Sequence, residues 1–269
     1  MSGHLRIDGQ RLEYRMLGPG PDDAPTIVLL HDGLGSVSTW RAFPEDLAKA
    51  TGLGVCVYSR AGYGRSTPCA LPRPLTYMHD EALETLPRVL DAIGLREGLL
   101  LGHSDGASIV AIHAGAHRDR RVRGLVLMAP HFFTEDSGIE AIERTRTDFE
   151  TSDLRARLAK HHGENVGVAF HGWNDAWLDP AFRRWDIREY LSKIRAPVLV
   201  LQGEDDAYGS VAQIETARSL CRAPLETLLL PECGHALHRD QPERTLAAVA
   251  DFAARALAVH ARSGEVESW

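Results

Sequence analysis

Ser104 stands between two glycines in the segment Leu99–Ile112, which reads LLLGHSDGASIVAI. An apolar run ends at Gly102, and a helix-like run of small residues follows Gly106. G-x-S-x-G between a strand and a helix is the pattern of a nucleophile elbow, a sharp turn that presents the serine hydroxyl to an incoming carbonyl. The two glycines are expected where a β-carbon would collide with neighbouring backbone. This stretch therefore predicts nucleophilic attack by Ser104.

A serine hydroxyl is a weak nucleophile, so this chemistry also needs a general base and an orienting carboxylate. In open α/β sheets such groups gather beyond the carboxyl ends of the strands. Two polar segments follow apolar runs in this way, Glu204–Asp206 and Glu232–His235. Ser, Asp, His is the chain order expected for an elbow serine. His235 is the predicted base, and His238 is a poorer choice because it lies one turn into the final helix.

The negative charge that develops on an attacked carbonyl oxygen needs backbone N–H donors. One donor is expected from Asp105, the residue after the nucleophile. The helix that begins there also directs its N-terminus, and hence its free N–H groups, toward the serine. The second donor is expected from the loop 31–35, which reads HDGLG.

Non-alternating apolar runs indicate the strands that hold these groups. Two short antiparallel strands are expected near residues 4–8 and 11–17, joined at an Asp-Gly turn. Six further runs are typical of strands covered on both faces: 26–30, 55–58, 99–101, 125–128, 198–201 and 225–230. Helix-like segments lie between them, near 39–50, 76–93, 105–117, 210–222 and 240–259. This alternation predicts an α/β fold with a mostly parallel eight-stranded sheet and helices on both faces.

One long segment departs from this alternation. Residues 131–193 are helical in pattern, rich in Phe and Trp, and lie between the sixth and seventh strands. We interpret them as a helical cap, with residues 1–130 and 194–269 forming the core. A lobe of this size cannot bury all its aromatic side chains alone, so some of them are expected to face a cleft. The expected lining of the substrate pocket is Asp32, Leu34, His103, Phe132, Trp173 and Trp177.

Several separate motifs together resemble the α/β-hydrolase superfamily, and more narrowly its small bacterial serine hydrolases with a helical cap. They are HDGLGS after the third strand, SRAGYGRS after the fourth, GHSDG, GEDD and CGH. The similarity extends from Thr26 to about Leu257. It implies the α/β-hydrolase fold with a cap inserted after strand 6. Relatives that open epoxides or remove halides carry an aspartate at the position of Ser104, which argues against those reactions here.

The resemblance also assigns roles. The acid usually stands three residues after the glycine that ends the strand, which selects Asp206, with Asp205 as runner-up. Some relatives carry the acid after the sixth strand, where this chain offers Glu135 and Asp136. The second oxyanion donor corresponds to Gly33. Asp32 departs from the common HGG pattern, although aspartate tolerates a left-handed backbone better than most residues.

These assignments predict a serine hydrolase that cleaves a small or medium, mainly apolar carboxylic ester through an acyl-enzyme. The same residues could serve lactones, thioesters, amides, carbamates or C–C bonds, and a ligand-binding receptor with little turnover is the alternative of another class. Asp32 and Asp105 would bring two carboxylates near the oxyanion hole. Neutral or cationic acyl groups are therefore expected to be preferred over anionic ones.

Composition narrows the setting. The chain has 269 residues, 44% of them hydrophobic, and a net charge of −7, which gives no general attraction for nucleic acid or an anionic membrane. A basic run at 117–123 lies where a helix should end, and there it favours a solvated turn over a binding patch. No apolar leader, membrane span or metal-binding cysteine spacing is present in the sequence, which predicts a cytoplasmic protein without cofactor or metal. The expected partner is a small-molecule substrate, with a homo-oligomer left open, and residues 262–269 are expected to fray.

Overall fold

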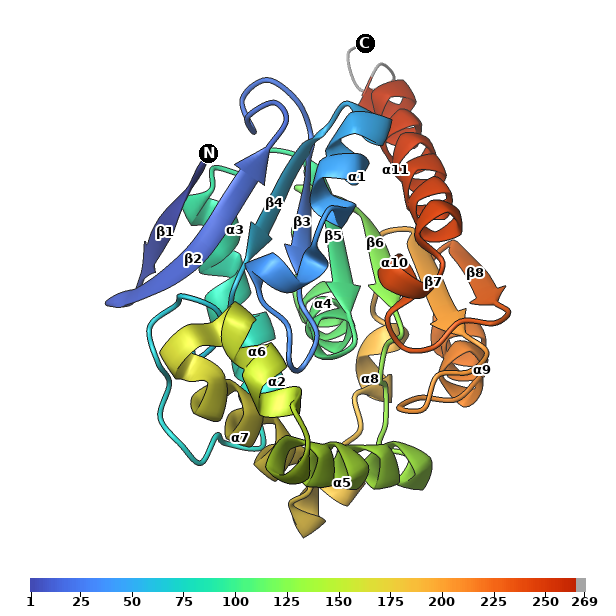
Figure 1. Ribbon diagram of the computed structural model, residues 1–269. Coiled ribbons are helices and arrows are strands. Elements are labelled where there is room, and N and C mark those ends of the chain that lie inside the picture. The colour runs from blue at the N-terminus through green and yellow to red at the C-terminus, as the bar shows by residue number, and fades with distance from the viewer. Residues whose placement is uncertain (265–269) are drawn as a thin grey trace.

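A single eight-stranded sheet runs through the protein (Figure 1). The computed structural model describes residues 1–264, so residues 265–269 of the tail expected to fray lie outside the described residues. The strands are β1 (Ser2–Ile7), β2 (Gln10–Leu17), β3 (Thr26–Leu30), β4 (Gly54–Tyr58), β5 (Gly98–His103), β6 (Val122–Met128), β7 (Val198–Gly203) and β8 (Leu225–Leu230). Their spatial order is β1-β2-β4-β3-β5-β6-β7-β8, and only the β1–β2 and β2–β4 pairings are antiparallel.

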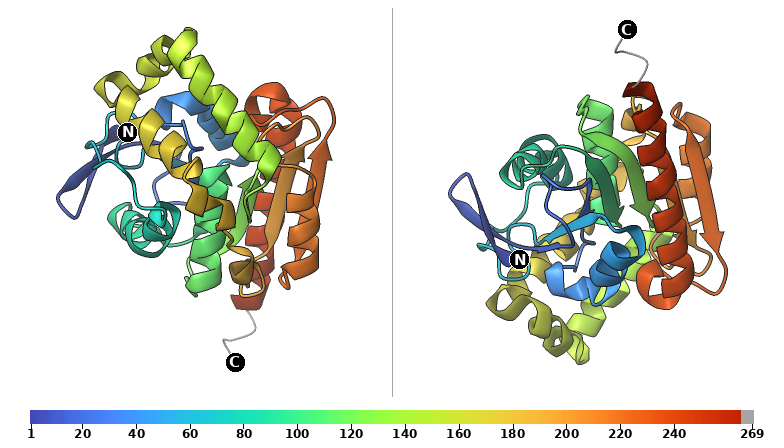
Figure 2. Two further views of the ribbon diagram at one scale, coloured as in Figure 1. Left: turned by 90° about the horizontal axis from the view of Figure 1, so that it is seen from below. Right: turned by 90° about the horizontal axis from the view of Figure 1, so that it is seen from above.

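Helices cover both faces of this sheet (Figure 2). The core helices are α1 (Phe43–Thr51), α2 (Tyr77–Asp80), α3 (Leu86–Ala92), α4 (Asp105–Ala116), α8 (Arg188–Leu191), α9 (Ala212–Leu220), α10 (Leu237–Asp240) and α11 (Pro242–Gly264). Helices α1 and α11 pack on one face, and α3, α4 and α9 build the hydrophobic core on the other. Strands β3, β4, β5 and β7 are buried along their whole length, which explains their non-alternating apolar sequences.

One predicted helix is interrupted. The segment expected to be helical over 76–93 contains α2, a π-helical stretch at Glu81–Thr85, and then α3. Pro87 lies in the first turn of α3 and has no N–H to donate to the carbonyl of Leu83, four residues back. The wider π turn absorbs this missing hydrogen bond without ending the helix.

Between β6 and β7 the chain forms α5 (Asp136–Thr151), α6 (Leu154–His162) and α7 (Val166–Trp177), with 3₁₀ turns at Gly163–Asn165 and Pro180–Arg184. These three helices pack on one another beyond the carboxyl ends of the parallel strands (Figure 1). The segments that leave and rejoin the core run side by side, because Ile187 N–H donates to Phe132 O at 2.8 Å. The short helix α8 packs against α4 and α9, on the core.

None of the helices within residues 1–264 combines the length and the apolar character that a membrane span requires.

Candidate active site

Ser104 occupies the turn between β5 and α4 with a φ of 55° and a ψ of −120°, a conformation that is strained for a residue with a side chain. The two flanking glycines make this turn possible. A β-carbon on Gly102 would overlap the backbone of Gly106, and one on Gly106 would overlap the backbone of Leu30 on the neighbouring strand β3. The glycine spacing seen in the sequence therefore has a steric cause, which is the close approach of α4 to β3.

The Ser104 side chain lines a cavity of about 80 Å³ that lies between the carboxyl edge of the sheet and the cap. Its lining comes from the oxyanion loop, the elbow, the segments after β6, β7 and β8, and the cap helices: Asp32, Gly33, Leu34, Ser104, Asp105, His131, Ile142, Trp173, Trp177, Tyr208 and His235. The cavity is small beside the roughly 300–1,000 Å³ of common ligand pockets.

His235 lines this cavity and forms a close pair with Asp206, which lies behind it. His235 Nδ1 lies 2.9 Å from Asp206 Oδ1 and 2.8 Å from Oδ2. Two further donors hold the carboxylate, the Gln202 side-chain amide at 2.7 Å and the Tyr208 backbone N–H at 2.8 Å. The Asp206 side chain is fully buried, whereas that of His235 retains 18% of its exposure. The pair thus has one end fixed in the protein and the other open to the cavity.

The charges of this pair reinforce each other. Burial alone would raise the pKa of Asp206, but the charge and hydrogen bond of His235 outweigh burial and lower that pKa to about 2. Burial alone would lower the pKa of His235, but the Asp206 carboxylate raises it above its ordinary value of 6.5. Such an imidazole is a better proton acceptor than a free histidine.

His131 is the hydrogen-bond partner of the Ser104 side chain. Its Nε2 lies 3.4 Å from Ser104 Oγ, and among residues 1–264 no hydrogen bond joins that oxygen to His235. The rings of His131 and His235 lie side by side, with centroids 5.9 Å apart. Burial, and secondarily the charge of His235, lower the pKa of His131 to about 3, so His131 is neutral near pH 7.

The alternative bases and acids lie elsewhere. His238 packs against the rings of Trp40 and His103, and burial lowers its pKa to about 3. Asp205 is exposed. Glu135 accepts hydrogen bonds from Ser210 and Gln213, and Asp136 forms an exposed ion pair with Arg183 at 2.5 Å. None of the four lines the cavity.

Gly33 and Asp105, the expected oxyanion donors, both line the cavity together with Ser104. A β-carbon on Gly33 would overlap the indole of Trp173, so the cap presses directly on this loop. The fully buried Arg60 holds the oxyanion loop in place, because its guanidinium donates to His31 O at 2.5 Å and to Asp32 O at 3.0 Å. These bonds satisfy the carbonyls of His31 and Asp32.

The Asp105 carboxylate is held by two aromatic donors. Tyr77 donates to Oδ2 at 2.5 Å, and the indole of Trp177 on α7 donates to Oδ1 at 3.2 Å. Burial raises the pKa of Asp105 and outweighs the opposing effects of Arg60 and Tyr77. One of the two donors belongs to the cap, so this carboxylate joins cap and core directly beneath the cavity.

Asp32, in the oxyanion loop, carries the second carboxylate that lines the cavity. Its Oδ1 lies 3.9 Å from His103 Nδ1, and its side chain keeps 30% of its exposure. Burial raises the pKa of Asp32, but the neighbouring His103 and His235 outweigh burial, and the pKa is lowered. Asp32 is therefore ionised near neutral pH.

Two residues expected in the pocket lie outside its lining. His103 turns the other way and places Nε2 2.8 Å from the His235 carbonyl, and Phe132 is fully buried in the hydrophobic core. The reason is that successive side chains of an extended chain point to opposite sides. His103 precedes Ser104 and Phe132 follows His131, and it is Ser104 and His131 that face the cavity. Asp32, Leu34, Trp173 and Trp177 do line the cavity.

The sequence did not single out His131, Ile142 or Tyr208, which also line the cavity. His131 had a detectable signal, because it is a polar residue three positions after a buried strand. The ring of Tyr208 lies 4.8 Å from that of His235, and its hydroxyl bonds Thr145 on α5 at 2.8 Å. Tyr208 thus connects the loop that carries Asp206 to the cap.

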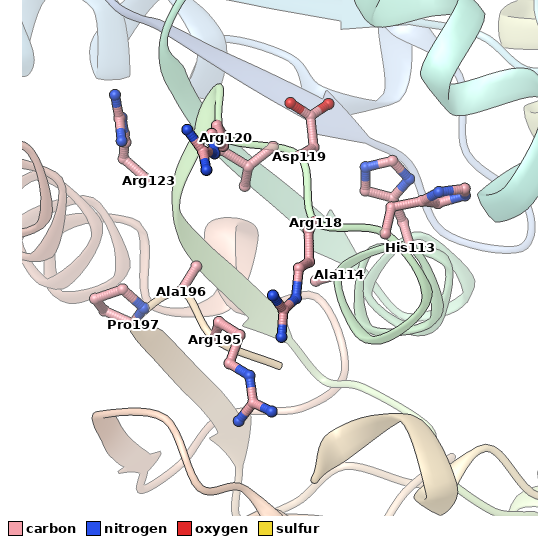
Figure 3. A pocket seen from close by; sticks show the side chains of 11 residues that line it. His113, Ala114, Arg118, Asp119, Arg120, Arg123, Arg195, Ala196 and Pro197 are labelled. Atoms are coloured by element: carbon pink, nitrogen blue, oxygen red, sulfur yellow. The ribbon is translucent and has the colours of Figure 1, made fainter. Parts of the chain in front are cut away.

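A larger pocket lies elsewhere in the fold. A pocket of about 440 Å³ opens near the C-terminal end of α4, where arginine side chains surround it (Figure 3). It shares no lining residue with the cavity at Ser104.

Comparisons with known proteins agree with this architecture. The sequence profile of the alpha/beta hydrolase family matches residues 27–249. The chain is 22% identical to epoxide hydrolase 3 of Xenopus tropicalis, over 96% of this chain and 79% of that protein. It is 25% identical to the bifunctional esterase/perhydrolase DCH of Acinetobacter calcoaceticus, over 70% of this chain and 76% of that protein.

A solved structure of a bacterial membrane phospholipase A superposes with a TM-score of 0.76 at 23% identity, covering 95% of this chain and 86% of that one. At this identity the likeness shows the fold. The profile match spans most of the chain and coincides with the sheet order and elbow described above. The chain therefore belongs to the alpha/beta hydrolase family, and its general activity is that of a hydrolase.

Proposed function

We propose that this protein is a serine hydrolase that cleaves a small or medium carboxylic ester through an acyl-enzyme intermediate. The observation that carries the proposal is that Ser104, on a strained elbow, lines the same cavity as His235, which is bonded to Asp206. An exposed serine alone is unreactive, and a histidine with a raised pKa beside it supplies the missing base.

In the proposed acylation, Ser104 Oγ attacks the ester carbonyl carbon while His235 Nε2 takes the hydroxyl proton. Asp206 holds the other ring nitrogen and stabilises the imidazolium. The N–H groups of Gly33 and Asp105 stabilise the tetrahedral oxyanion. When the oxyanion collapses, the C–O bond to the alcohol breaks, and His235 returns its proton to the leaving alkoxide.

In the proposed deacylation, water attacks the Ser104 ester and gives one proton to His235. Collapse of the second tetrahedral intermediate breaks the bond to Oγ, and the proton passes from His235 to Ser104. The carboxylic acid leaves, and the enzyme regains its starting protonation state. The overall reaction consumes one ester and one water and produces one acid and one alcohol.

The cavity supports a compact, mainly apolar substrate. Trp173, Trp177, Ile142 and Leu34 supply apolar walls, and the volume of about 80 Å³ suits a short acyl group. Lactones, thioesters, amides, carbamates and C–C bonds need the same nucleophile and base, so a panel of such substrates has to follow the first test.

The first test is intact-mass analysis after treatment with a fluorophosphonate, on wild type and on the Ser104→Ala variant in parallel. One adduct on wild type and none on the variant supports an activated Ser104. A panel of short-chain esters, with turnover abolished in the same variant, then supports ester hydrolysis.

A binding protein with little turnover is the second candidate, because the Ser104 hydroxyl bonds His131 and not the stronger base His235. Folded wild type that takes up no adduct, and hydrolyses no ester of the panel, would reject the hydrolytic mechanism in favour of this one.

A further inference from the structure

The pocket of Figure 3 lies at the edge of the sheet opposite to Ser104. It is formed by the end of α4, the turn that follows it, the first two residues of β6, and the turn 195–197 that leads into β7. Because β5 and β6 are parallel, the start of β6 is remote from the carboxyl edge that carries the elbow. Helix α4 has 12 residues and separates the two places by about 18 Å at 1.5 Å per residue.

Four arginines line this pocket, which we call the arginine pocket: Arg118, Arg120, Arg123 and Arg195. Arg123 is neutralised by Glu97 at 2.8 Å. Within residues 1–264, Arg118, Arg120 and Arg195 are exposed and have no ion pair with a carboxylate.

The one acidic residue of the lining does not offset this charge. The guanidinium of Arg121 binds the carboxylate of Asp119. Its Nη2 donates to Oδ2 at 2.7 Å, and its Nε donates to Oδ1 at 2.9 Å and to Oδ2 at 3.2 Å. The carbonyl end of α4 would by itself repel anions. The three unpaired guanidinium groups make the local electrostatic potential positive there, although the net charge of the chain is −7.

A second observation concerns a buried histidine in the lining. His113 is 1% exposed, and its Nδ1 lies 3.0 Å from the Ala82 carbonyl, which can only accept a hydrogen bond. Burial lowers the pKa of His113, so the ring is neutral near pH 7 and carries its proton on Nδ1. Nε2 is then a bare acceptor, and it has no partner among the side chains of residues 1–258. The exposed ring of His117 lies beside it, with centroids 5.0 Å apart.

The remaining lining is apolar, consisting of Ala114, Val122, Ala196 and Pro197. A volume of about 440 Å³ falls within the range of small-molecule sites of roughly 300–1,000 Å³. The pocket thus offers unpaired guanidinium groups for phosphate, an acceptor for a hydroxyl, and an apolar wall. Guanidinium groups suit phosphate oxygens because they donate two parallel hydrogen bonds.

We infer that the arginine pocket binds a phosphorylated, hydroxyl-bearing small molecule of about nucleotide size. Arg118, Arg120 and Arg195 contact its phosphate groups, and His113 Nε2 accepts a hydrogen bond from its sugar once His117 turns aside. The apolar wall packs against the remainder of the ligand. This binding is independent of the hydrolytic cavity, because the two sites share no residue.

The test is isothermal titration calorimetry of the full chain at low ionic strength with four probes: ADP, ribose 5-phosphate, pyrophosphate and adenosine. ADP is expected to bind and adenosine is not. ADP binding is expected to weaken as salt is added, since the contacts are charged. Tighter binding of ADP or ribose 5-phosphate than of pyrophosphate supports the sugar contact. Equal or tighter binding of pyrophosphate overturns that contact and leaves a site for inorganic phosphate.

The variant is Arg118→Gln/Arg195→Gln, and the control is Arg6→Gln/Arg184→Gln. The control removes the same charge from two exposed arginines that do not line the pocket. The variant is expected to weaken ADP binding by about tenfold or more, which corresponds to loss of charge-assisted hydrogen bonds. The control is expected to bind as wild type does.

Equal weakening in variant and control would show nonspecific charge attraction, and wild-type affinity in the variant would show a different site. Either result overturns the proposal, as does absence of ADP binding to wild type. All three proteins should react equally with a fluorophosphonate, because neither pair of substitutions touches the cavity at Ser104. Failure of that reaction bears on the proposed hydrolysis alone.

Discussion

Ser104 Oγ lies 3.4 Å from Nε2 of His131, a histidine whose pKa is lowered to about 3. The stronger base, His235, lies beside His131 in the same cavity and is bonded to Asp206. The serine side chain therefore rests against the less basic of two histidines, and its hydroxyl has to turn toward His235 before its proton can leave.

This relationship predicts the effect of His131→Phe, which removes the hydrogen-bond partner of Ser104 but keeps a ring in its place. The hydroxyl is then free to bond His235, and the rate of fluorophosphonate labelling should increase about fivefold, since a typical hydrogen bond contributes roughly 1 kcal/mol. Stopped-flow labelling of wild type and variant measures the ratio. A hundredfold loss in a variant with unchanged thermal stability would instead make His131 part of the catalytic machinery.

Substitution of the buried acid should be far more damaging. Asp206→Asn removes the charge that holds His235 in the required tautomer, and kcat/KM on a short ester should fall by about 10³- to 10⁴-fold. Asp205→Asn is the matched control, because its side chain is exposed one residue earlier, and it should retain activity within about twofold. Comparable losses in both variants would contradict the assignment of the acid.

The dependence on pH follows from the His235 pKa, which the Asp206 carboxylate raises above 6.5 despite burial. His235 accepts the Ser104 proton only when unprotonated, so kcat/KM should rise with pH through an apparent pKa above 6.5. In Asp206→Asn the negative charge that raises the His235 pKa is gone. The rise of the fluorophosphonate labelling rate with pH should therefore occur at lower pH in this variant. An acidic limb with the same midpoint in both proteins would show that another group titrates.

The selectivity for substrate charge should depend on Asp32, which is ionised and lines the cavity in the oxyanion loop. A succinate half-ester should react more slowly than the matched neutral diester, because its carboxylate would approach Asp32. Asp32→Asn should reduce that ratio of rates by about fivefold, which corresponds to roughly 1 kcal/mol, the interaction of two unit charges about 4 Å apart in water. Faster turnover of the half-ester than of the diester by wild type would refute this idea.

Much of the site follows from local pattern. Gly102 and Gly106 mark the elbow because sterics at one turn require them. Asp206 and His235 follow strands whose apolar runs are plain in the sequence, and parallel strands bring their carboxyl ends together. The eight strands and their mostly parallel arrangement are confirmed for the same reason.

The rest depends on packing between distant segments. Nothing near Arg60 in the sequence indicates that it is buried beneath the oxyanion loop, since its partners, His31 and Asp32, lie 29 and 28 residues away. The arginine pocket shows the same limit. The run 117–123 is visible in the sequence as a solvated turn, but Arg195 joins it only because β6 and β7 are neighbours.

Helix α4 is buried over its first nine residues, from Asp105 to His113. Backbone amides in such an element exchange with solvent only when the whole domain opens, in contrast to those of surface loops. The nucleophile is therefore attached to one of the last parts of the molecule to loosen. On heating, the elbow should keep its shape until the sheet itself melts, so thermal inactivation and global unfolding become a single event.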